Sequence, residues 1–252
     1  MELTNSIRKM VASLGNARNR REEGCFVVEG TKCVLDTLAF FSCRYLLATT
    51  QWVETNKEHI EGKNVIVVKR TDVERMSQLN TPTQVIAVYN LPEKQFTYSI
   101  FDNLVIALDR VQDPGNLGTI IRIADWFGIT DIVCSRDTVD VYNPKVIQAT
   151  MGAISRVNVH YVDLVDVLGN VASHKPIYGT FLDGDNIYEK ELSQNGVVVM
   201  GNEGSGMSSE IANIVNSRLY IPSHPIDRPT SESLNVGMAT AITIAEFRRR
   251  IK

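Results

Sequence analysis

The chain has only four cysteines and four histidines among its 252 residues. Neither set shows the short spacing of a metal site or of a redox-active cysteine pair. The eight residues are Cys25, Cys33, Cys43, Cys134, His59, His160, His174 and His224. We therefore expect that the protein binds no metal ion and is not held together by disulfides.

Long apolar runs are also missing. No run approaches the roughly eighteen residues that a membrane span needs. The first ten residues, MELTNSIRKM, lack the apolar stretch of a signal peptide. Hydrophobic residues make up 44% of the chain and charged residues 22%, as in an ordinary soluble protein. The sequence predicts a cytoplasmic protein that does not contact membranes.

The chain as a whole has no excess of positive charge. Its net charge of −3 argues against a protein that coats nucleic acid over its entire surface. Within the first 21 residues, however, five basic residues stand against Glu2 alone, a local net charge of +4 (5 − 1). The five are Arg8, Lys9, Arg18, Arg20 and Arg21. They predict a basic arm, although a solvated helix face explains this composition equally well.

A glycine-rich turn follows the apolar run 197–200, which is typical of a buried strand in a parallel sheet. Gly201, Gly204 and Gly206 would let the backbone approach a ligand at the carboxyl end of that strand. A P-loop would need a lysine where Met207 stands, and a dinucleotide site would need G-x-G-x-x-G instead of G-x-x-G-x-G. ATP and NAD are therefore disfavoured, and an ordinary strand-to-helix turn stays open.

Strand-like and helix-like segments alternate along the chain, which predicts an α/β protein. The proline-containing polar segment 91–95 predicts a linker, so residues 1–92 and 96–252 are expected to form two domains. In the second domain, strands are expected at 104–109, 131–134, 157–161, 177–182, 197–201 and 219–221. Several have β-branched runs without alternation, which predict a parallel sheet covered on both faces.

A helix is expected at 117–127, with Asn116 placed to cap it. Its sequence, LGTIIRIADWF, is apolar almost all round, which predicts that the helix is buried. Arg122 is its only basic residue, and burying an unpaired guanidinium is costly. Arg122 is therefore expected either to face a functional site or to pair with Asp125.

Three blocks of sequence, in this order, resemble the three motifs of the SpoU/TrmH branch of the SPOUT methyltransferases. They are LDRVQDPGNLGTIIRIADWFGI at 108–129, VVVMGNEGSGMSSE at 197–210 and LYIPSHPIDRPTSESLNVG at 219–237. The resemblance covers residues 104–250. The pattern ARNRREEGCFVVEG at 17–30 resembles the N-terminal substrate-binding domain that many SpoU proteins carry.

The resemblance implies a fold and a set of site residues. The fold is an α/β/α methyltransferase domain with a deep trefoil knot, after a smaller ribosomal-protein-like α/β/α domain that binds RNA. The implied catalytic residues are Arg122, Asn116, Glu203, Ser233 and Asn235. The implied S-adenosylmethionine contacts are Gly201, Asn202, Gly204, Ile221, Leu234 and Leu182, and the implied RNA contacts are Arg8, Lys9, Arg18, Arg20 and Arg21. Simpler roles stay open, with Glu203 as a solvated turn residue and Ser233 and Asn235 as helix caps.

The activity implied by the resemblance is methyl transfer from S-adenosylmethionine to a ribose 2′-hydroxyl of RNA by a homodimer, with ribosomal RNA favoured. A transfer RNA substrate and a non-catalytic RNA-binding protein stay as alternatives. A guanidinium is effectively always protonated, so Arg122 is expected to grip a phosphate or stabilise alkoxide charge. The loop at 223–232 is longer than in the family and lacks glycine, which makes Asp227 and Arg228 further candidates for RNA or dimer contacts.

Overall fold

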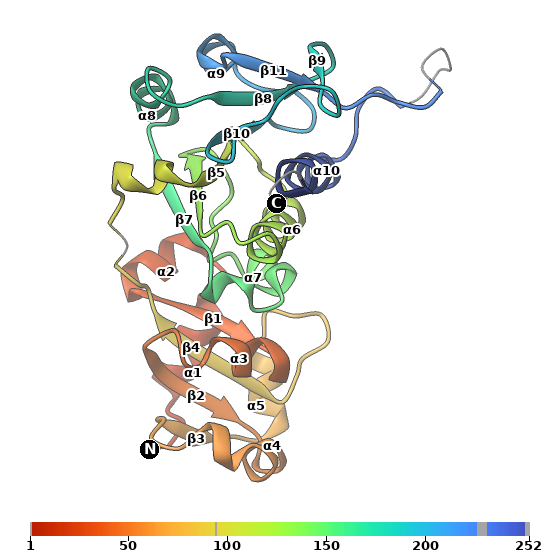
Figure 1. Cartoon of the computed structure of the whole chain (residues 1–252). Helices are drawn as coiled ribbons and strands as arrows, with labels where there is room; N and C mark the ends of the chain where they lie inside the picture. Colours follow the sequence, from red (N-terminus) through yellow and green to blue (C-terminus); the bar gives the residue numbers. More distant parts are fainter. Residues whose placement is uncertain (1, 94, 226–230, 250–252) are drawn as a thin grey trace. The chain divides into compact units, whose positions relative to one another are not determined.

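The computed structural model describes residues 2–93, 95–225 and 231–249 (Figure 1). The chain divides into two compact units. The first is Met1–Glu93 together with Asp140–Ser155, and the second is Lys94–Val139 together with Arg156–Lys252. The sequence-based boundaries assign Asp140–Ser155 to the second domain, whereas this segment makes its contacts within the first unit.

The N-terminal unit is built on a four-stranded mixed sheet in the order β1-β4-β2-β3. The strands are β1 (Cys25–Glu29), β2 (Cys43–Ala48), β3 (Val65–Val67) and β4 (Val85–Asn90). β4 pairs antiparallel with β1 and β2, and β3 pairs parallel with β2. All of β1 and the first five residues of β4 are buried, so both faces of the sheet are covered.

Short helices surround this sheet. They are α1 (Asn5–Ser13), α2 (Ala17–Glu23), α3 (Thr31–Thr37), α4 (Thr50–Thr55), α5 (Arg70–Met76) and α7 (Pro144–Thr150), with 3₁₀ turns η1 (Lys57–His59) and η3 (Ala153–Ser155). The hydroxyl of Thr4 caps α1 by accepting a hydrogen bond from the Ile7 N–H at 3.2 Å. Val11 on α1 and Leu14, which directly follows the helix, are fully buried.

Arg20 is a buried cation, with 2% of its surface exposed. Its guanidinium donates to the carbonyl oxygens of Leu14 and Gly15, at 2.8 and 2.9 Å. It also donates to Asp140 Oδ2, through Nη2 at 2.5 Å and Nε at 3.2 Å. These partners compensate for the loss of water around the charge. The prediction that Arg20 contacts RNA is therefore wrong, because solvent does not reach it.

Two more contacts hold the Asp140–Ser155 segment to the N-terminal unit. The ring of Tyr142 lies 4.6 Å from the ring of Phe26, centroid to centroid. The side-chain amide of Gln148 donates to the carbonyl oxygen of Glu29 at 2.8 Å. The segment is therefore part of the core of this unit, although more than forty residues separate it from Glu93 in the sequence.

The second unit is built on a seven-stranded sheet in the order β7-β6-β5-β10-β8-β11-β9, and its strand pairs are parallel. The strands are β5 (Leu104–Leu108), β6 (Asp131–Ser135), β7 (Asn158–Val162), β8 (Ile177–Phe181), β9 (Asp185–Asn186), β10 (Gly196–Met200) and β11 (Ser217–Tyr220). Each residue of β5 and β10 is buried, which confirms the predicted parallel sheet covered on both faces.

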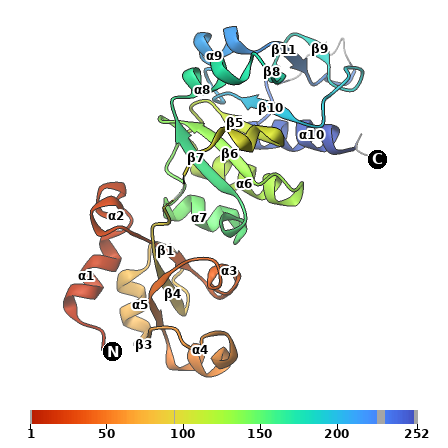
Figure 2. The same ribbon diagram turned by 60° about the vertical axis from the view of Figure 1, so that its left-hand side comes forward.

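Helices cover the two faces of this sheet (Figure 2). They are α6 (Pro114–Trp126), α8 (Leu164–Val171), α9 (Ser209–Ile214) and α10 (Val236–Arg249), with the 3₁₀ turn η2 (Tyr98–Asp102). α8 and α9 lie on one face, where Leu168 and Ile211 pack into an apolar core with Val133 and Val199. α6 and α10 pack against each other on the other face. The trefoil knot stays a prediction.

Within the described ranges, none of the helices is long and apolar enough to span a membrane. The same residues contain no group of three or more histidine, cysteine, aspartate or glutamate side chains arranged to hold a metal ion.

Candidate active site

The glycine turn that follows β10 is closed by its own backbone. Asn202 N–H donates to the Gly206 carbonyl at 3.0 Å, and Gly206 N–H donates back to the Asn202 carbonyl at 2.9 Å. A Cβ on Gly201 would lie 2.5 Å from the nitrogen of Met207, so only glycine fits there. A Cβ on Gly204 would meet its nearest atom at 3.6 Å, an ordinary contact. Gly201 is thus required by the closure of the turn, which differs from the predicted reason, close approach of a ligand.

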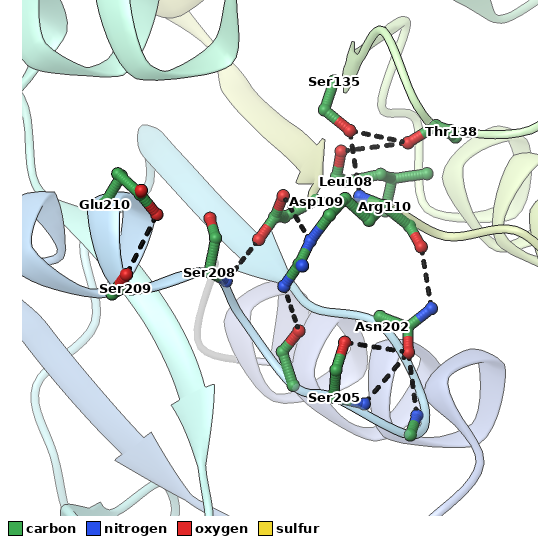
Figure 3. Close-up of polar contacts among 12 residues, drawn as sticks. Leu108, Asp109, Arg110, Ser135, Thr138, Asn202, Ser205, Ser208, Ser209 and Glu210 are labelled. Carbon is green, nitrogen blue, oxygen red and sulfur yellow. Dashed lines mark hydrogen bonds and ion pairs between the residues drawn. The ribbon is translucent and has the colours of Figure 1, made fainter.

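The side chain of Asn202 braces this turn from within (Figure 3). Its Oδ1 accepts hydrogen bonds from Gly204 N–H at 2.9 Å, Ser205 N–H at 3.0 Å and the Ser205 hydroxyl at 3.2 Å. Its Nδ2 donates to the carbonyl oxygen of Arg110 at 2.9 Å. The Asn202 side chain therefore has a structural role, and any cofactor contact from this residue would come from its backbone.

Asp109 and Arg110, at the carboxyl end of β5, support the turn from the neighbouring strand (Figure 3). The buried carboxylate of Asp109 accepts a hydrogen bond from Ser208 N–H at 2.6 Å. Arg110 has a φ of +59°, a left-handed conformation that is unfavourable for residues other than glycine. Its Nη2 lies 3.5 Å from the carbonyl oxygen of Gly206 and its Nε lies 3.5 Å from Asp109 Oδ1. We call these two residues the Asp109–Arg110 clasp.

The sequence-based site does not include the Asp109–Arg110 clasp. One signal could have found it, because both residues directly follow a buried parallel strand, at the edge where such sheets bind ligands. The left-handed backbone of Arg110 gives no signal in the sequence.

Asn116 lies in the first turn of α6 and does not cap it. The helix begins at Pro114, and the carboxylate of Asp113 is the cap, accepting a hydrogen bond from Asn116 N–H at 2.8 Å. The predicted cap is therefore wrong by three residues, because proline at the first helical position extends the helix toward the N-terminus. As a result, the side chain of Asn116 is available for other contacts.

Asn116 connects Glu203 and Asn235 in one hydrogen-bonded cluster. Its Nδ2 donates to Glu203 Oε1, and its Oδ1 accepts from Asn235 Nδ2 at 2.9 Å. Three of the five predicted catalytic residues thus come together from α6, the glycine turn and the start of α10. Glu203 is half-buried and bonded, so the simpler interpretation of a solvated turn residue is wrong.

Asn235 has a second role as the cap of α10. Its Oδ1 accepts hydrogen bonds from Gly237 N–H at 2.9 Å and Met238 N–H at 3.3 Å. The predicted capping role is confirmed, and it coexists with the bond to Asn116. A Cβ on Gly237 would lie 3.2 Å from Thr119 Cγ2, so glycine allows α10 to start close to α6. This close packing brings Asn235 within reach of Asn116.

Arg122 lies on an exposed side of α6, which corrects two expectations. The helix is not buried all round, because Trp126 is 85% exposed and the buried side consists of residues such as Leu117 and Ile121. Asp125 does not pair with Arg122, because Arg156 holds it through Nε at 2.8 Å and Nη2 at 2.7 Å. Among the described residues, Arg122 has no hydrogen-bond or ion-pair partner.

Three of the predicted cofactor residues lie at one edge of the sheet. Leu182, Gly201 and Ile221 each directly follow the carboxyl end of β8, β10 or β11, and β8 lies between the other two strands. Leu182 is 71% exposed and Leu234 is 48% exposed. Exposed apolar side chains beside free strand ends suit a ligand with an apolar ring and polar edges.

Two of the remaining predictions concern Ser233 and the long loop. Ser233 is exposed. Asp227 and Arg228, named as candidates for RNA or dimer contacts, lie outside the described residues.

The predicted basic arm is partly neutralised by ion pairs. Arg8 Nη2 lies 3.0 Å from Asp72 Oδ1. Arg18 pairs with Glu22 at 2.7 Å, four residues later on α2, in the manner of a solvated helix face. Arg20 is buried, as described above, whereas Lys9 and Arg21 are exposed. Contacts of Lys9, Arg18 and Arg21 with RNA stay predictions.

Comparison with known proteins gives two family matches. The model of the SpoU rRNA Methylase family matches residues 103–245, and that of the MRM3-like substrate binding domain matches residues 5–87. The chain is 27% identical over 237 residues to the 23S rRNA (guanosine(2553)-2′-O)-methyltransferase RlmP of Bacillus subtilis, and the alignment covers 93% of each chain.

Solved structures are similar over nearly the whole length of the chain. A TrmH-family protein from Porphyromonas gingivalis is 38% identical with a TM-score of 0.89, covering 99% of both chains. An AdoMet-bound rRNA methyltransferase from Sinorhizobium meliloti is 27% identical with a TM-score of 0.85, covering 100% of this chain and 98% of the other.

Proposed function

Because the chain belongs to the SpoU rRNA methylase family, we propose that it transfers a methyl group from S-adenosylmethionine to a ribose 2′-hydroxyl of ribosomal RNA. The observation that carries this proposal is the cluster of Asn116, Glu203 and Asn235, in which two hydrogen bonds through Asn116 link three distant segments. Relatives that cover nearly the whole chain and methylate rRNA at the 2′-oxygen support the choice of substrate.

The residues at the sheet edge suit S-adenosylmethionine. Leu182, Ile221 and Leu234 offer apolar side chains for the adenine ring, and Gly201 and Gly204 offer backbone groups for its polar edges. When bound, the cofactor supplies a sulfonium-activated methyl group. The chain's own task is to place the hydroxyl in line with that methyl group and to accept its proton.

Glu203 is the residue that we assign to the hydroxyl. Asn116 holds one oxygen of its carboxylate, Oε1. Within the described residues, no hydrogen bond reaches the other oxygen, Oε2. A fixed carboxylate with one free oxygen can accept a hydrogen bond from the ribose 2′-hydroxyl and orient it. Asn235 in turn fixes the amide of Asn116, so the orientation is set by the fold.

Arg122 cannot join this cluster from the same face of α6. It lies six residues after Asn116, which turns it by roughly 120° around the helix axis relative to Asn116. It shares its face with Trp126, four residues later, and Trp126 is 85% exposed. Met238 on α10 is 61% exposed. We propose that a second copy of the chain covers these apolar side chains in a homodimer, which brings Arg122 to the site of the partner subunit.

In that arrangement the guanidinium of Arg122 grips a phosphate or stabilises charge that develops on the 2′-oxygen. A base role is excluded by its permanent protonation. The cytoplasmic location inferred from the sequence stays a prediction.

The reaction is tested with radiolabelled S-adenosylmethionine and unmodified transcripts of large-subunit rRNA and of tRNA, followed by mapping of 2′-O-methyl positions. We expect label in the rRNA and little in the tRNA, and loss of at least about a hundredfold in rate for Glu203→Gln. Calorimetry should show binding of S-adenosylmethionine without comparable binding of NAD or ATP. Label in tRNA alone would show that the substrate is tRNA and not rRNA. Label in neither RNA would refute the proposed methyltransferase activity on these RNAs.

Complementation tests the shared site. Arg122→Ala and Glu203→Gln are each expected to be inactive, and a mixture of the two is expected to recover about a quarter of wild-type activity, because one site in each mixed dimer is intact. Exchange of subunits in the mixture is verified separately. If subunits exchange and the mixture is as inactive as each variant alone, Arg122 and Glu203 do not act together at a site shared between two subunits.

A further inference from the structure

A hollow opens on the N-terminal unit, next to the carboxyl ends of β2 and β3 and the start of β4. It consists of two adjoining depressions of about 430 and 490 Å³, which share Gln51, Arg70 and Gln84. Its lining residues are 31, 49–52, 55–56, 67–70 and 82–84. The elements around it, α4, α5 and β3, lie together in both views (Figures 1 and 2). We call this surface the Gln51–Arg70 hollow.

The lining of the hollow carries positive charge and hydrogen-bond donors without carboxylates. Lys69 and Arg70 are its cations, and Gln51 and Gln84 contribute side-chain amides. Five threonines also line it: Thr31, Thr49, Thr50, Thr55 and Thr83. The rest of the lining consists of Asn56 and the side chains of Trp52, Val67, Val68 and Pro82. No aspartate or glutamate is among these lining residues. Such a surface complements a chain of phosphates and hydroxyls, which presents many oxygen acceptors.

Several of these groups are available to a ligand. In the part of the chain that the structure describes, the side chains of Gln51, Lys69 and Gln84 make no hydrogen bond or ion pair. Arg70 pairs with Glu74 at 3.2 Å, four residues later on α5. Both side chains of that pair are largely solvent-exposed, and exposed pairs of this kind are weak. Arg70 can therefore exchange Glu74 for a phosphate at little cost.

The basic residues near the N-terminus are less available than those of the hollow. Asp72 holds Arg8, Glu22 holds Arg18, and Asp140 holds the buried Arg20. The excess of positive charge that the sequence shows in residues 1–21 is therefore partly neutralised by ion pairs in the fold. The cations of the hollow are less obvious in the sequence, because the surrounding segment also contains Asp72 and Glu74.

We propose that the Gln51–Arg70 hollow is the surface on which the N-terminal unit holds the RNA substrate. Lys69 and Arg70 bind phosphates, and the amides of Gln51 and Gln84 contact bases or ribose hydroxyls of unpaired nucleotides. The inference rests on the proposed function, RNA methylation, and adds the place and the residues of RNA docking.

The test measures binding of the full-length protein to a fluorescently labelled, unmodified transcript of large-subunit rRNA at several salt concentrations. Lys69→Gln/Arg70→Gln is expected to bind about tenfold more weakly, and the slope of log affinity against log salt is expected to fall by about 1 to 2. Gln51→Ala/Gln84→Ala is expected to weaken binding several-fold with the slope unchanged, because it removes hydrogen bonds and no charge.

The matched control is Arg75→Gln, which removes one exposed positive charge from the same helix, α5, outside the hollow. It is expected to leave affinity and slope within about twofold of wild type. S-adenosylmethionine affinity and melting temperature, measured for each variant, should stay at wild-type values, because the substituted side chains lie on the surface of the N-terminal unit.

Two results would overturn the inference. One is wild-type affinity and salt slope for Lys69→Gln/Arg70→Gln, and the other is a loss that appears only in Arg18→Gln/Arg21→Gln. The methylation assay separates this inference from the proposed function. If the wild-type protein methylates the transcript and the hollow variants keep the wild-type KM for RNA, the RNA-docking role of the hollow is refuted and the proposed function is not. Wild-type protein that methylates no RNA refutes the function itself.

Discussion

Arg20 and Asp140 form an ion pair across 120 residues of sequence, with Arg20 Nη2 at 2.5 Å from Asp140 Oδ2. The two partners differ in burial, because the Arg20 side chain is 2% exposed and that of Asp140 is 32% exposed. Removing Asp140 would leave a buried cation without a counter-charge, whereas removing Arg20 would leave a carboxylate that water can reach.

We predict that Asp140→Ala lowers the free energy of unfolding by about 3 kcal/mol, the scale of leaving one buried charge unpaired. The control is Arg18→Ala on the same helix, which breaks an exposed pair and should cost less than about 0.5 kcal/mol. Urea unfolding measures both. Equal, small effects would show that the guanidinium of Arg20 gains water when Asp140 is lost.

Arg122→Ala should leave stability unchanged while reducing activity. The side chain is exposed and has no partner among the described residues, so the free energy of unfolding should change by less than about 0.5 kcal/mol. The rate of methyl transfer should fall about a hundredfold, the scale of losing one transition-state contact. Thermal melting and initial rates on RNA are the measurements. A variant with the wild-type rate would remove Arg122 from the mechanism.

The left-handed backbone of Arg110 can be separated from its side chain by two substitutions. Arg110→Gly and Arg110→Ala both remove the guanidinium from the Asp109–Arg110 clasp, but only alanine keeps the unfavourable φ of +59°. Arg110→Ala should therefore be less stable than Arg110→Gly by about 1 kcal/mol. Both should raise the KM for S-adenosylmethionine if the guanidinium helps to hold the glycine turn. If both variants keep the wild-type KM for S-adenosylmethionine, the guanidinium of Arg110 has no part in cofactor binding.

Asn116→Asp tests the hydrogen-bonded cluster. The substitution replaces the donor to Glu203 with a second carboxylate oxygen, so two negative charges face each other. We expect a larger loss of melting temperature than for Asn116→Ala, which removes the bonds without adding charge. Both variants should lose about a hundredfold or more in rate. If Asn116→Asp is the more stable of the two, a proton is shared between the carboxylates.

The pair of Asp131 and His160 predicts a pH dependence of stability. The hydrogen bond from His160 holds the pKa of Asp131 below its ordinary value of 3.8. A carboxyl group with a lowered pKa in the folded state stabilises the fold above its ordinary pKa, and this contribution is lost as the pH falls below about 3.8. Asp131→Asn should therefore be less stable than wild type at pH 7, and the difference should shrink at pH 3. A difference in unfolding free energy that is constant with pH would contradict this.

Local sequence patterns were sufficient for most strands of the second unit, and the family resemblance was sufficient to name the three residues of the catalytic cluster. Runs of β-branched residues predict strands because a strand buried on both faces needs apolar side chains at each position, as β5 and β10 show. β9 has two residues, too few for any pattern. The three motif blocks identified Asn116, Glu203 and Asn235, but their mutual hydrogen bonds depend on helix packing that periodicity does not describe.

Properties that depend on distant partners could not be predicted. Arg20 looks like a surface cation in its local sequence, and its burial becomes visible only when Asp140 lies beside it. Asp125 is three residues from Arg122, yet it pairs with Arg156, 31 residues away. The misjudged burial of α6 has a similar origin, because an apolar composition does not reveal that Trp126 has no neighbouring element to cover it within the described chain.

The closure of the glycine turn has a consequence for the kinetics of binding. Its backbone bonds between Asn202 and Gly206, its bonds to the Asn202 side chain and the contact of Asp109 with Ser208 all come from the chain itself. The entropy of ordering this turn is therefore lost during folding and not during association. A cofactor should bind in a single step, with an observed rate constant that rises linearly with cofactor concentration and reaches no plateau from a slow isomerisation.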